Sequence, residues 1–247
     1  MRAVSIVVGL VALVAGCGPE TPRQDAAMAA SPKAAPRAEP RPSLANCPAV
    51  RPIDEPEMLQ RKTAIPLPSA LTGLMVSDKE RFGVAARDGN PICIDASWWE
   101  EIANAKVSQD QRFIQFDWMG YESFGHLLID RTGDGTVVET GISPLAPPTG
   151  RRFAAVDLSE SAFGALNAFA VWQIEPVGIR QLAKFDQDMP QGDWSVDGWQ
   201  GDGCVNLSVV PIDRQPGFAP DLAKAPRDPW FAAEAKGWKP EPGRCPG

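Results

Sequence analysis

The stretch that decides the fold runs from Phe-Ile-Gln-Phe-Asp-Trp at 113–118 to Gly-His-Leu-Leu-Ile-Asp at 125–130. The second run is followed by the turn sequence Thr-Gly-Asp-Gly at 132–135 and by Thr-Val-Val-Glu at 136–139. Short apolar runs bounded by glycine and aspartate are typical of strands joined by tight turns. The pattern predicts an antiparallel hairpin across 125–140 and a chain that is mainly β.

Further short apolar segments extend the β pattern on the C-terminal side. They predict strands at Phe153–Asp157, Ala168–Ile174, Ile179–Ala183 and Cys204–Pro211. Helix is scarce. One short amphipathic helix is expected at Ala96–Ala105, because Trp98, Trp99 and Ile102 fit a helical spacing, and a single turn is expected at Leu222–Ala225.

A weak internal repeat underlies this pattern. Polar turns lead into strands at Val76–Phe82, Val107–Phe113 and Pro147–Phe153, and more faintly at Gln200–Val205. The repeat resembles the Ser-Pro-Asp-Gly-Arg-x-Ile-Ala-Phe element of TolB-like propeller repeats in bacterial envelope proteins, although the central Asp-Gly survives only at Asp202-Gly203. The resemblance covers roughly residues 76–212 and implies antiparallel strands in blade-like repeats. A partial or small propeller and an irregular β-sandwich both remain open.

The N-terminus carries a processing signal. Met1-Arg2 precedes an apolar run of about 12 residues, where a membrane-spanning helix needs roughly 20. The run ends at Val14-Ala15-Gly16-Cys17, which resembles the lipobox of bacterial lipoproteins. The resemblance implies that residues 1–16 are a signal peptide and that Cys17 is lipidated, and Gly18 after it implies sorting to the outer membrane. A plain secretory signal is the alternative.

Composition divides the remaining chain into two parts. Residues 17–46 are rich in proline and alanine without apolar periodicity, which predicts a disordered tether behind the lipid. Residues 47–247 are long enough for one buried core and are expected to form a single β-rich globular domain. The formal charge of −7 and the lack of a basic cluster in the globular part disfavour nucleic-acid binding.

The cysteines agree with export to an oxidising compartment. Cys47, Cys93, Cys204 and Cys245 remain after Cys17 is set aside, and an even number predicts disulfides. Three pairings are possible. We expect Cys93 to pair with Cys204, since both stand beside strand-like segments, and Cys47 to pair with Cys245 and join the two ends of the domain.

The search for catalytic and metal sites gives mostly negative answers. The single histidine, His126, is expected on the polar face of a hairpin strand. Ser123 lacks the Gly-x-Ser-x-Gly context of a nucleophile elbow, and Asp130 and Asp134 lack the spacing of a calcium loop, so turn chemistry explains them. No close cysteine pair indicates a metal site, and no cofactor is indicated. Glycosidases use pairs of carboxylates, and Glu100, Glu101 and Glu122 are of that type, but nothing in the sequence sets their separation.

Eight tryptophans stand against one tyrosine. Most are expected to fill the core. The pair Trp98-Trp99 is the exception, because neighbours on a strand or helix point in different directions, so that one of them is expected to be exposed on a binding surface. These observations favour a membrane-anchored, periplasm-facing envelope lipoprotein that binds an envelope protein or cell-wall glycan without catalysis. The alternatives are a carbohydrate- or peptidoglycan-active enzyme and a purely structural assembly lipoprotein.

Overall fold

A computed structural model describes residues 40–50, 63–121, 123–158, 164–215 and 222–247. All of them lie in one compact unit, Ala38–Gly247. The signal peptide, Cys17 and most of the expected tether lie outside the described residues, as does Glu122.

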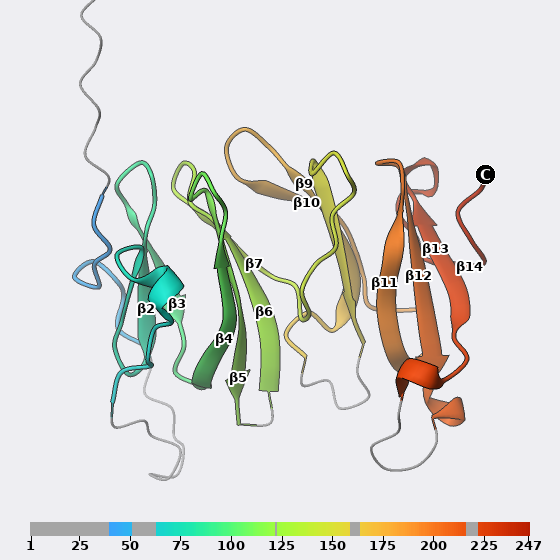
Figure 1. Ribbon diagram of the computed structural model, residues 1–247, viewed down its shortest axis with the longest axis horizontal. Helices are drawn as coiled ribbons and strands as arrows, with labels where there is room; N and C mark the ends of the chain where they lie inside the picture. The colour runs from blue at the N-terminus through green and yellow to red at the C-terminus, as the bar shows by residue number, and fades with distance from the viewer. Residues whose placement is uncertain (1–39, 51–62, 122, 159–163, 216–221) are drawn as a thin grey trace, which may run out of the picture. The chain divides into compact units, whose positions relative to one another are not determined.

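The described chain forms four antiparallel sheets that follow one another in sequence order (Figure 1). Sheet A contains β1 (Met75–Ser77), β2 (Arg81–Ala85) and β3 (Pro91–Asp95). Sheet B contains β4 (Trp99–Val107), β5 (Phe113–Gly120), β6 (Ser123–Asp130) and β7 (Thr136–Glu139). Sheet C contains β8 (Arg152–Asp157), β9 (Ala168–Ile174) and β10 (Ile179–Phe185). Sheet D contains β11 (Gly192–Gln200), β12 (Cys204–Pro211), β13 (Asp228–Ala233) and β14 (Glu241–Pro242).

Each sheet is a meander in which every strand pairs with the next one along the chain. The expected mainly β class, with antiparallel strands in blade-like units, is therefore confirmed. The predicted 125–140 hairpin is β6–β7, and the strands predicted at 168–174 and 204–211 match β9 and β12. Helix in the described ranges is limited to short 3-10 turns at Ser69–Leu71, Ile212–Arg214, Leu222–Lys224 and Glu234–Lys236. None of them is long enough to cross a membrane.

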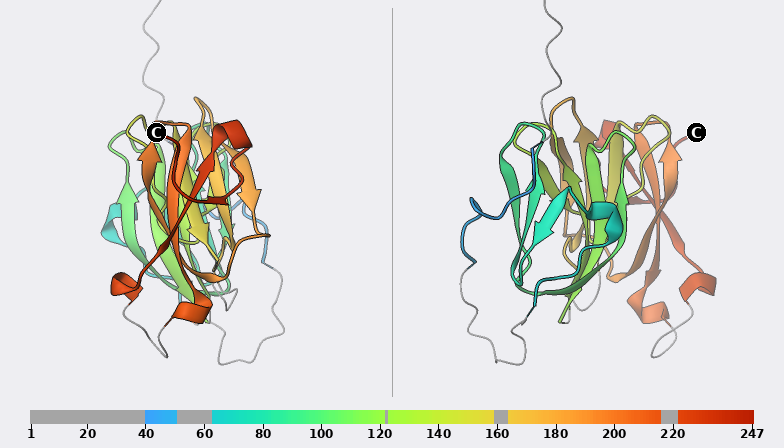
Figure 2. Two further views of the ribbon diagram at one scale, coloured as in Figure 1. Left: turned by 90° about the vertical axis from the view of Figure 1, so that its right-hand side faces the viewer. Right: turned by 60° about the vertical axis from the view of Figure 1, so that its left-hand side comes forward.

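The sheets pack face to face through three apolar clusters. One joins sheets A and B around Phe82, Trp99 and Phe116, with the Trp99 and Trp118 rings stacked 4.8 Å apart. A second joins sheets B and C, and a third joins sheets C and D. Burying each large side chain stabilises the fold by roughly 1.5–3 kcal/mol. In the right-hand view of Figure 2, sheet A lies at the front and sheet D at the far side.

Strands β8 and β9 of sheet C read as nearly continuous apolar runs, which their packing explains. On β8, Phe153 and Ala155 face the cluster shared with sheet B, while Ala154 and Val156 face the cluster shared with sheet D. Successive side chains of a strand point to opposite faces, so a strand with a sheet packed on both sides is apolar at every position.

The segment expected to be a helix, Ala96–Ala105, is largely strand β4, and that prediction is wrong. Strand β4 pairs with β5 through two register shifts, between Trp99 and Glu101 and between Ala103 and Lys106. Each β-bulge inserts an extra residue, so the core-facing positions Trp99, Ile102 and Ala105 recur every third residue instead of every second. The two bulges therefore give the apolar residues of β4 a spacing close to that of a helix.

The four cysteines form two disulfides, as expected, but the expected pairing is wrong. Cys47 bonds to Cys93 on β3, and Cys204 on β12 bonds to Cys245. Each bridge links partners that belong to one end of the domain, because the meanders keep neighbouring sequence together. Residues before Cys47 also meet sheet A: a side chain on Gly83 of β2 would come within 2.5 Å of the Ser43 carbonyl oxygen.

Candidate functional site

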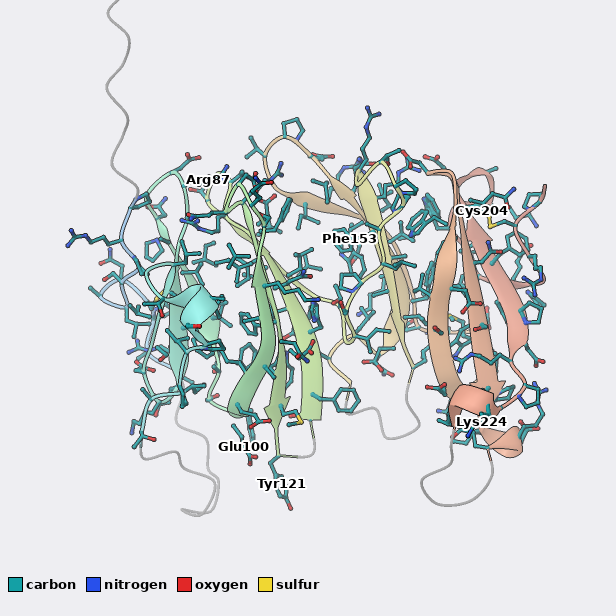
Figure 3. The ribbon with its side chains drawn as sticks, in the orientation of Figure 1. Arg87, Glu100, Tyr121, Phe153, Cys204 and Lys224 are labelled. Carbon is teal, nitrogen blue, oxygen red and sulfur yellow. A yellow bond between two sulfur atoms is a disulfide. The ribbon has the colours of Figure 1, made fainter. Side chains whose placement is uncertain are left out.

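One end of sheet B exposes a group of large apolar side chains. We call it the aromatic end, and it consists of Trp98, Met119, Tyr121 and Phe124, whose exposed fractions are 48%, 51%, 59% and 39%. Figure 3 labels Tyr121 and the neighbouring Glu100 at this end, and Arg87 at the opposite end of the sheets. Contiguous exposed apolar side chains mark interaction surfaces more often than scattered ones do.

Strand pairing brings these four residues together. Met119 of β5 lies directly opposite Phe124 of β6, and Tyr121 occupies the turn between the two strands. Trp98 precedes β4, whose first residue pairs with Gly120. A Cβ atom on Gly120 would come within 2.1 Å of the Trp98 carbonyl oxygen, so a glycine is required for this close approach.

A cavity of about 440 Å³ begins at the same place, since Phe124 also forms part of its wall. Its remaining apolar wall comes from Ile142, Val156, Leu158, Trp194 and Ile212. Gly192 and three polar residues complete the lining, and the polar residues are Asp157, Asp193 and Gln215. The cavity therefore collects residues from sheets B, C and D.

Asp157, the last residue of β8, is the unusual member of this lining. The residue is only 7% exposed, and its Oδ2 atom has no hydrogen-bond partner. Burial raises the pKa of this carboxyl, and a hydrogen bond from the Leu166 backbone N–H offsets only part of that effect. Gly141 and Gly164 leave room for it, because a Cβ atom on either would lie within 2.4 Å of Oδ2.

The other polar residues of the cavity are already engaged. Arg227 donates hydrogen bonds to Oδ2 of Asp193 and to its backbone oxygen, each at 2.6 Å. Gln215 donates its side-chain N–H to the Val210 carbonyl, and the Trp194 indole N–H donates to the Pro190 carbonyl. Of the two described carboxylates in the lining, Asp193 has a cationic partner, whereas Asp157 Oδ2 has no hydrogen-bond partner.

His126 does not lie where the sequence indicated. It stands on β6 as expected, but it is 3% exposed rather than on a polar, solvated face. Its Nδ1 atom lies 2.5 Å from Asp117 Oδ1, and Asn104 donates to Asp117 Oδ2 at 2.6 Å. The Nε2 atom has no partner. Ser123 is three residues away on the same strand, about 10 Å along it, so these residues form no Ser-His-Asp arrangement.

The expected binding pair Trp98-Trp99 divides as predicted, with one member exposed. Trp98 belongs to the aromatic end, whereas Trp99 is 4% exposed and packs in the core, which removes it from any binding surface. Glu100 and Glu101 are exposed neighbours on β4. The third carboxylate, Glu122, and the lipidation residue Cys17 lie outside the described residues.

The sequence analysis missed Asp157, Met119 and Phe124. The signal for Asp157 was present: a carboxylate ends the apolar run Ala-Ala-Val-Asp-Leu at 154–158, where strand alternation places it between two sheets. Among the described residues no group of three or more histidine, cysteine, aspartate or glutamate side chains is placed to hold a metal ion. Comparisons of the chain with family models, curated proteins and solved structures found no match.

Proposed function

We propose that this protein is a lipid-anchored cell-envelope protein that binds another envelope protein through its aromatic end, without catalysing a reaction. The observation that carries the proposal is the exposure of Trp98, Met119, Tyr121 and Phe124 at one end of sheet B. Tryptophan, tyrosine and methionine are enriched in the buried centres of protein interfaces.

A protein partner fits this surface better than a glycan does. The described aromatic end mixes flexible methionine with rings from three different strands or turns and is flanked by the exposed carboxylates Glu100 and Glu101. Charge complementarity therefore favours a partner whose contact surface carries a basic rim. The chain as a whole is acidic, with a formal charge of −7, which extends the same preference.

The proposed location comes from the N-terminal sequence. Cys17 follows the lipobox, and two or more acyl chains hold a protein on a membrane stably. The proline-rich segment behind it gives the domain reach from the membrane surface. The disulfides support an oxidising compartment, and Gly18 supports the outer membrane, facing the periplasm.

A carbohydrate-active enzyme is less well supported by the same observations. Such an enzyme would need two carboxylates and an accessible tryptophan in one cleft. Asp157, Asp193 and Trp194 do share a cavity, but Asp193 is held by Arg227 and Trp194 is only 7% exposed. A buried ring does not offer its face to a sugar.

Site-specific photo-crosslinking in cells tests the binding function. A photoreactive residue at position 121 is expected to crosslink one defined protein, whereas the same residue at position 177 is not. Val177 is a matched control because it is 67% exposed and apolar but lies in the β9–β10 turn near the opposite end of β5. Equal crosslinking from both positions, or none from position 121, would refute the proposal.

The purified partner then allows a quantitative test. Trp98→Ala and Tyr121→Ala are each expected to weaken binding by about tenfold or more, as truncated interface centres do, while Val177→Ala leaves the affinity unchanged. Lipid anchoring is tested separately by the mass of the mature protein, which should show acyl chains that are absent from Cys17→Ser.

A further inference from the structure

Strand β7 leaves one edge of sheet B without a partner strand. It is the last strand in the order β4-β5-β6-β7 and pairs only with β6. The Thr140 N–H donates to the His126 carbonyl, and antiparallel pairs alternate between hydrogen-bonded and non-hydrogen-bonded residues. The N–H and C=O groups of Val137 and Glu139 therefore point away from β6. In the part of the chain that the structure describes, no further hydrogen bond engages these groups.

A groove of about 300 Å³ lies along this free edge, between β7 and sheet C. Its floor comes from sheet C, where Trp172 of β9 and both Ile179 and Gln181 of β10 lie on the face toward sheet B. Val138 and Leu166 close its inner side. A further strand beside β7 would extend sheet B over this floor and bury its apolar part.

Contacts between the sheets fix the two ends of the groove. At the start of β7, the Gly178 N–H in the β9–β10 turn donates to the Thr132 hydroxyl at 3.0 Å, so β7 and β10 begin at the same end. Beyond the last residue of β7, the Ala165 N–H donates to the Phe124 carbonyl and continues the edge of β6. Strand β7 itself has four residues. The free edge therefore suits a short extended segment of about five residues.

Two exposed charged side chains of the groove have no ion-pair partner among the described residues. Lys184 of β10 lies opposite Ala170 of β9, on the face toward sheet B, near the end of β7. Glu139 lies opposite Leu127, whose side chain packs toward sheet A, so Glu139 projects from the other face of sheet B. A strand added to β7 would thus meet a cation on one face and an anion on the other.

We propose that β7 binds an extended peptide segment of a partner protein as a fifth strand of sheet B. The segment runs antiparallel to β7 and exchanges backbone hydrogen bonds with Val137 and Glu139. On the face toward sheet C it presents an acidic residue to Lys184 and apolar residues to the floor. On its other face a basic residue lies opposite Glu139. The backbone supplies the affinity, and the alternating charges supply the specificity.

Isothermal titration of the full-length protein in detergent tests the groove with two matched peptides. The first, acetyl-Glu-Lys-Val-Thr-Val-amide, places its acidic residue toward sheet C and its basic residue opposite Glu139. The second exchanges the first two residues and keeps the composition. The first peptide is expected to bind at least threefold more tightly, because both charged pairs become like-charged with the second.

Variants separate the strand edge from general electrostatics. Val137→Pro removes an N–H that the β6–β7 pairing does not use, and it should weaken binding at least fivefold, whereas Val137→Thr keeps the N–H and should change the affinity less than twofold. If Val137→Pro impairs folding, the double variant Lys184→Glu with Glu139→Lys should reverse the preference between the two peptides. Lys106→Glu, on exposed β4 at the opposite edge of sheet B, should leave the affinity unchanged.

Hydrogen exchange locates the bound peptide. With saturating peptide, the amide protons of Val137 and Glu139 should exchange at least fivefold more slowly, because both become hydrogen-bonded. The proposal is overturned by no binding at millimolar peptide, by unchanged exchange at these two amides, or by equal affinity for the two peptides. Dimerisation of the wild type that Val137→Pro abolishes would also overturn it, since a second copy would then be the occupant. None of these results bears on crosslinking at position 121, so the proposed function of the aromatic end is tested separately.

Discussion

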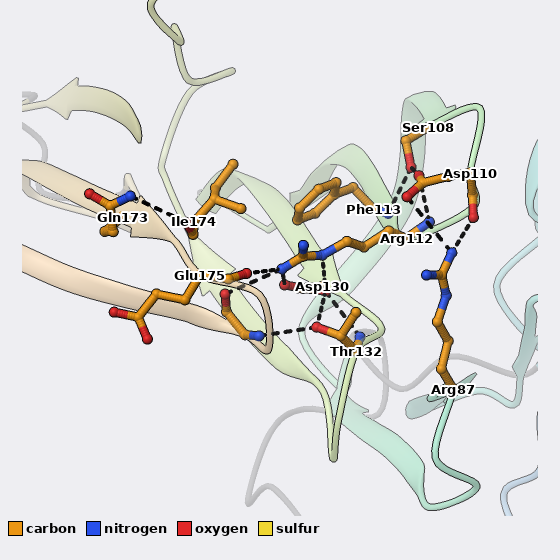
Figure 4. Close-up of polar contacts among 11 residues, drawn as sticks. Arg87, Ser108, Asp110, Arg112, Phe113, Asp130, Thr132, Gln173, Ile174 and Glu175 are labelled. Carbon is orange, nitrogen blue, oxygen red and sulfur yellow. Dashed lines mark hydrogen bonds and ion pairs between the residues drawn. The ribbon is translucent and has the colours of Figure 1, made fainter. Parts of the chain in front are cut away.

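Arg112 and Asp130 form a bidentate ion pair at the end of sheet B opposite to the aromatic end (Figure 4). Arg112 Nε donates to Oδ1 at 3.0 Å and one terminal nitrogen donates to Oδ2 at 2.6 Å. The same nitrogen also donates to the Glu175 backbone oxygen in the β9–β10 turn, at 2.5 Å. Arg112 therefore neutralises the buried Asp130 carboxylate and also links sheet B to sheet C by a hydrogen bond.

Asp130→Asn is expected to lower the free energy of unfolding by about 3–5 kcal/mol. The carboxylate is 0% exposed and the arginine side chain 16% exposed, so the substitution leaves a largely buried charge without its counter-ion. Urea unfolding at pH 7 measures the effect. Glu175→Gln is the control, because it breaks the exposed Glu175–Arg180 pair and should change stability by less than about 1 kcal/mol.

The same pair gives a pH dependence of known sign. Burial acts to raise the pKa of Asp130, but hydrogen bonds from Arg112 and Thr132 outweigh it, and the pKa is lowered overall. A carboxyl with a lowered folded-state pKa stabilises the protein above its unfolded value, near 3.9, and that contribution is lost as the pH falls. The unfolding midpoint of the wild type should therefore drop more steeply between pH 5 and pH 2 than that of Asp130→Asn. Parallel curves would contradict this assignment.

Substitutions of the two adjacent tryptophans, Trp98 and Trp99, should affect binding and stability separately. Trp99→Ala removes a core ring stacked on Trp118 and is expected to cost about 3–5 kcal/mol of unfolding free energy. Trp98→Ala should change it by less than about 0.5 kcal/mol, because nearly half of the side chain is exposed. Thermal unfolding of both variants provides the measurement. A large loss for Trp98→Ala would mean that its role is structural and would weaken the case for the aromatic end.

Local pattern predicted the apolar strands β9 and β12 well and the bulged strand β4 badly. Strands β9 and β12 have sheets or strands on both sides, so their apolar runs reported burial directly. Strand β4 lies at the edge of sheet B, where two bulges changed its spacing. The bulges arise from the pairing of β4 with β5, and the sequence of β4 alone does not contain that information.

The candidate site depends on tertiary contacts that local pattern does not encode. The sequence singled out Trp98 because of its neighbour, but Phe124 reaches the same surface through pairing with Met119. Asp157 acquires its character from Gly141 and Gly164, which stand 16 residues before and 7 residues after it in the chain. The disulfide pairing failed for a related reason, since proximity to strands says nothing about which sheet each strand joins.

Disulfide connectivity makes a covalent prediction. Digestion without reduction should release one linked peptide pair containing Cys47 and Cys93 and another containing Cys204 and Cys245. A linked pair containing Cys93 and Cys204 would contradict the sheet assignment. With separations of 46 and 41 residues, chain entropy attributes about 4 kcal/mol to each bridge. The variant with Cys204→Ser and Cys245→Ser should lose up to that amount in chemical unfolding.

Asp157→Asn is expected to change the free energy of unfolding in the opposite direction to Asp130→Asn. Burial raises the pKa of Asp157, so the folded protein holds this proton more tightly than the unfolded chain does. Its contribution is fully present below the unfolded pKa and is lost as the pH rises through the folded-state value. As the pH rises, ionisation of this unpartnered carboxyl therefore costs the folded protein stability.

Replacing that carboxylate by the neutral amide should raise the free energy of unfolding at pH 7 by about 0.5–2 kcal/mol, within the range of single stabilising substitutions. The gain should shrink as the pH is lowered toward 4, because protonation of the wild-type carboxyl removes the same charge. Urea unfolding at pH 4 and pH 7 measures both values, and Asp213→Asn serves as the exposed control. A loss of stability at pH 7 would instead show that the carboxylate supports the fold.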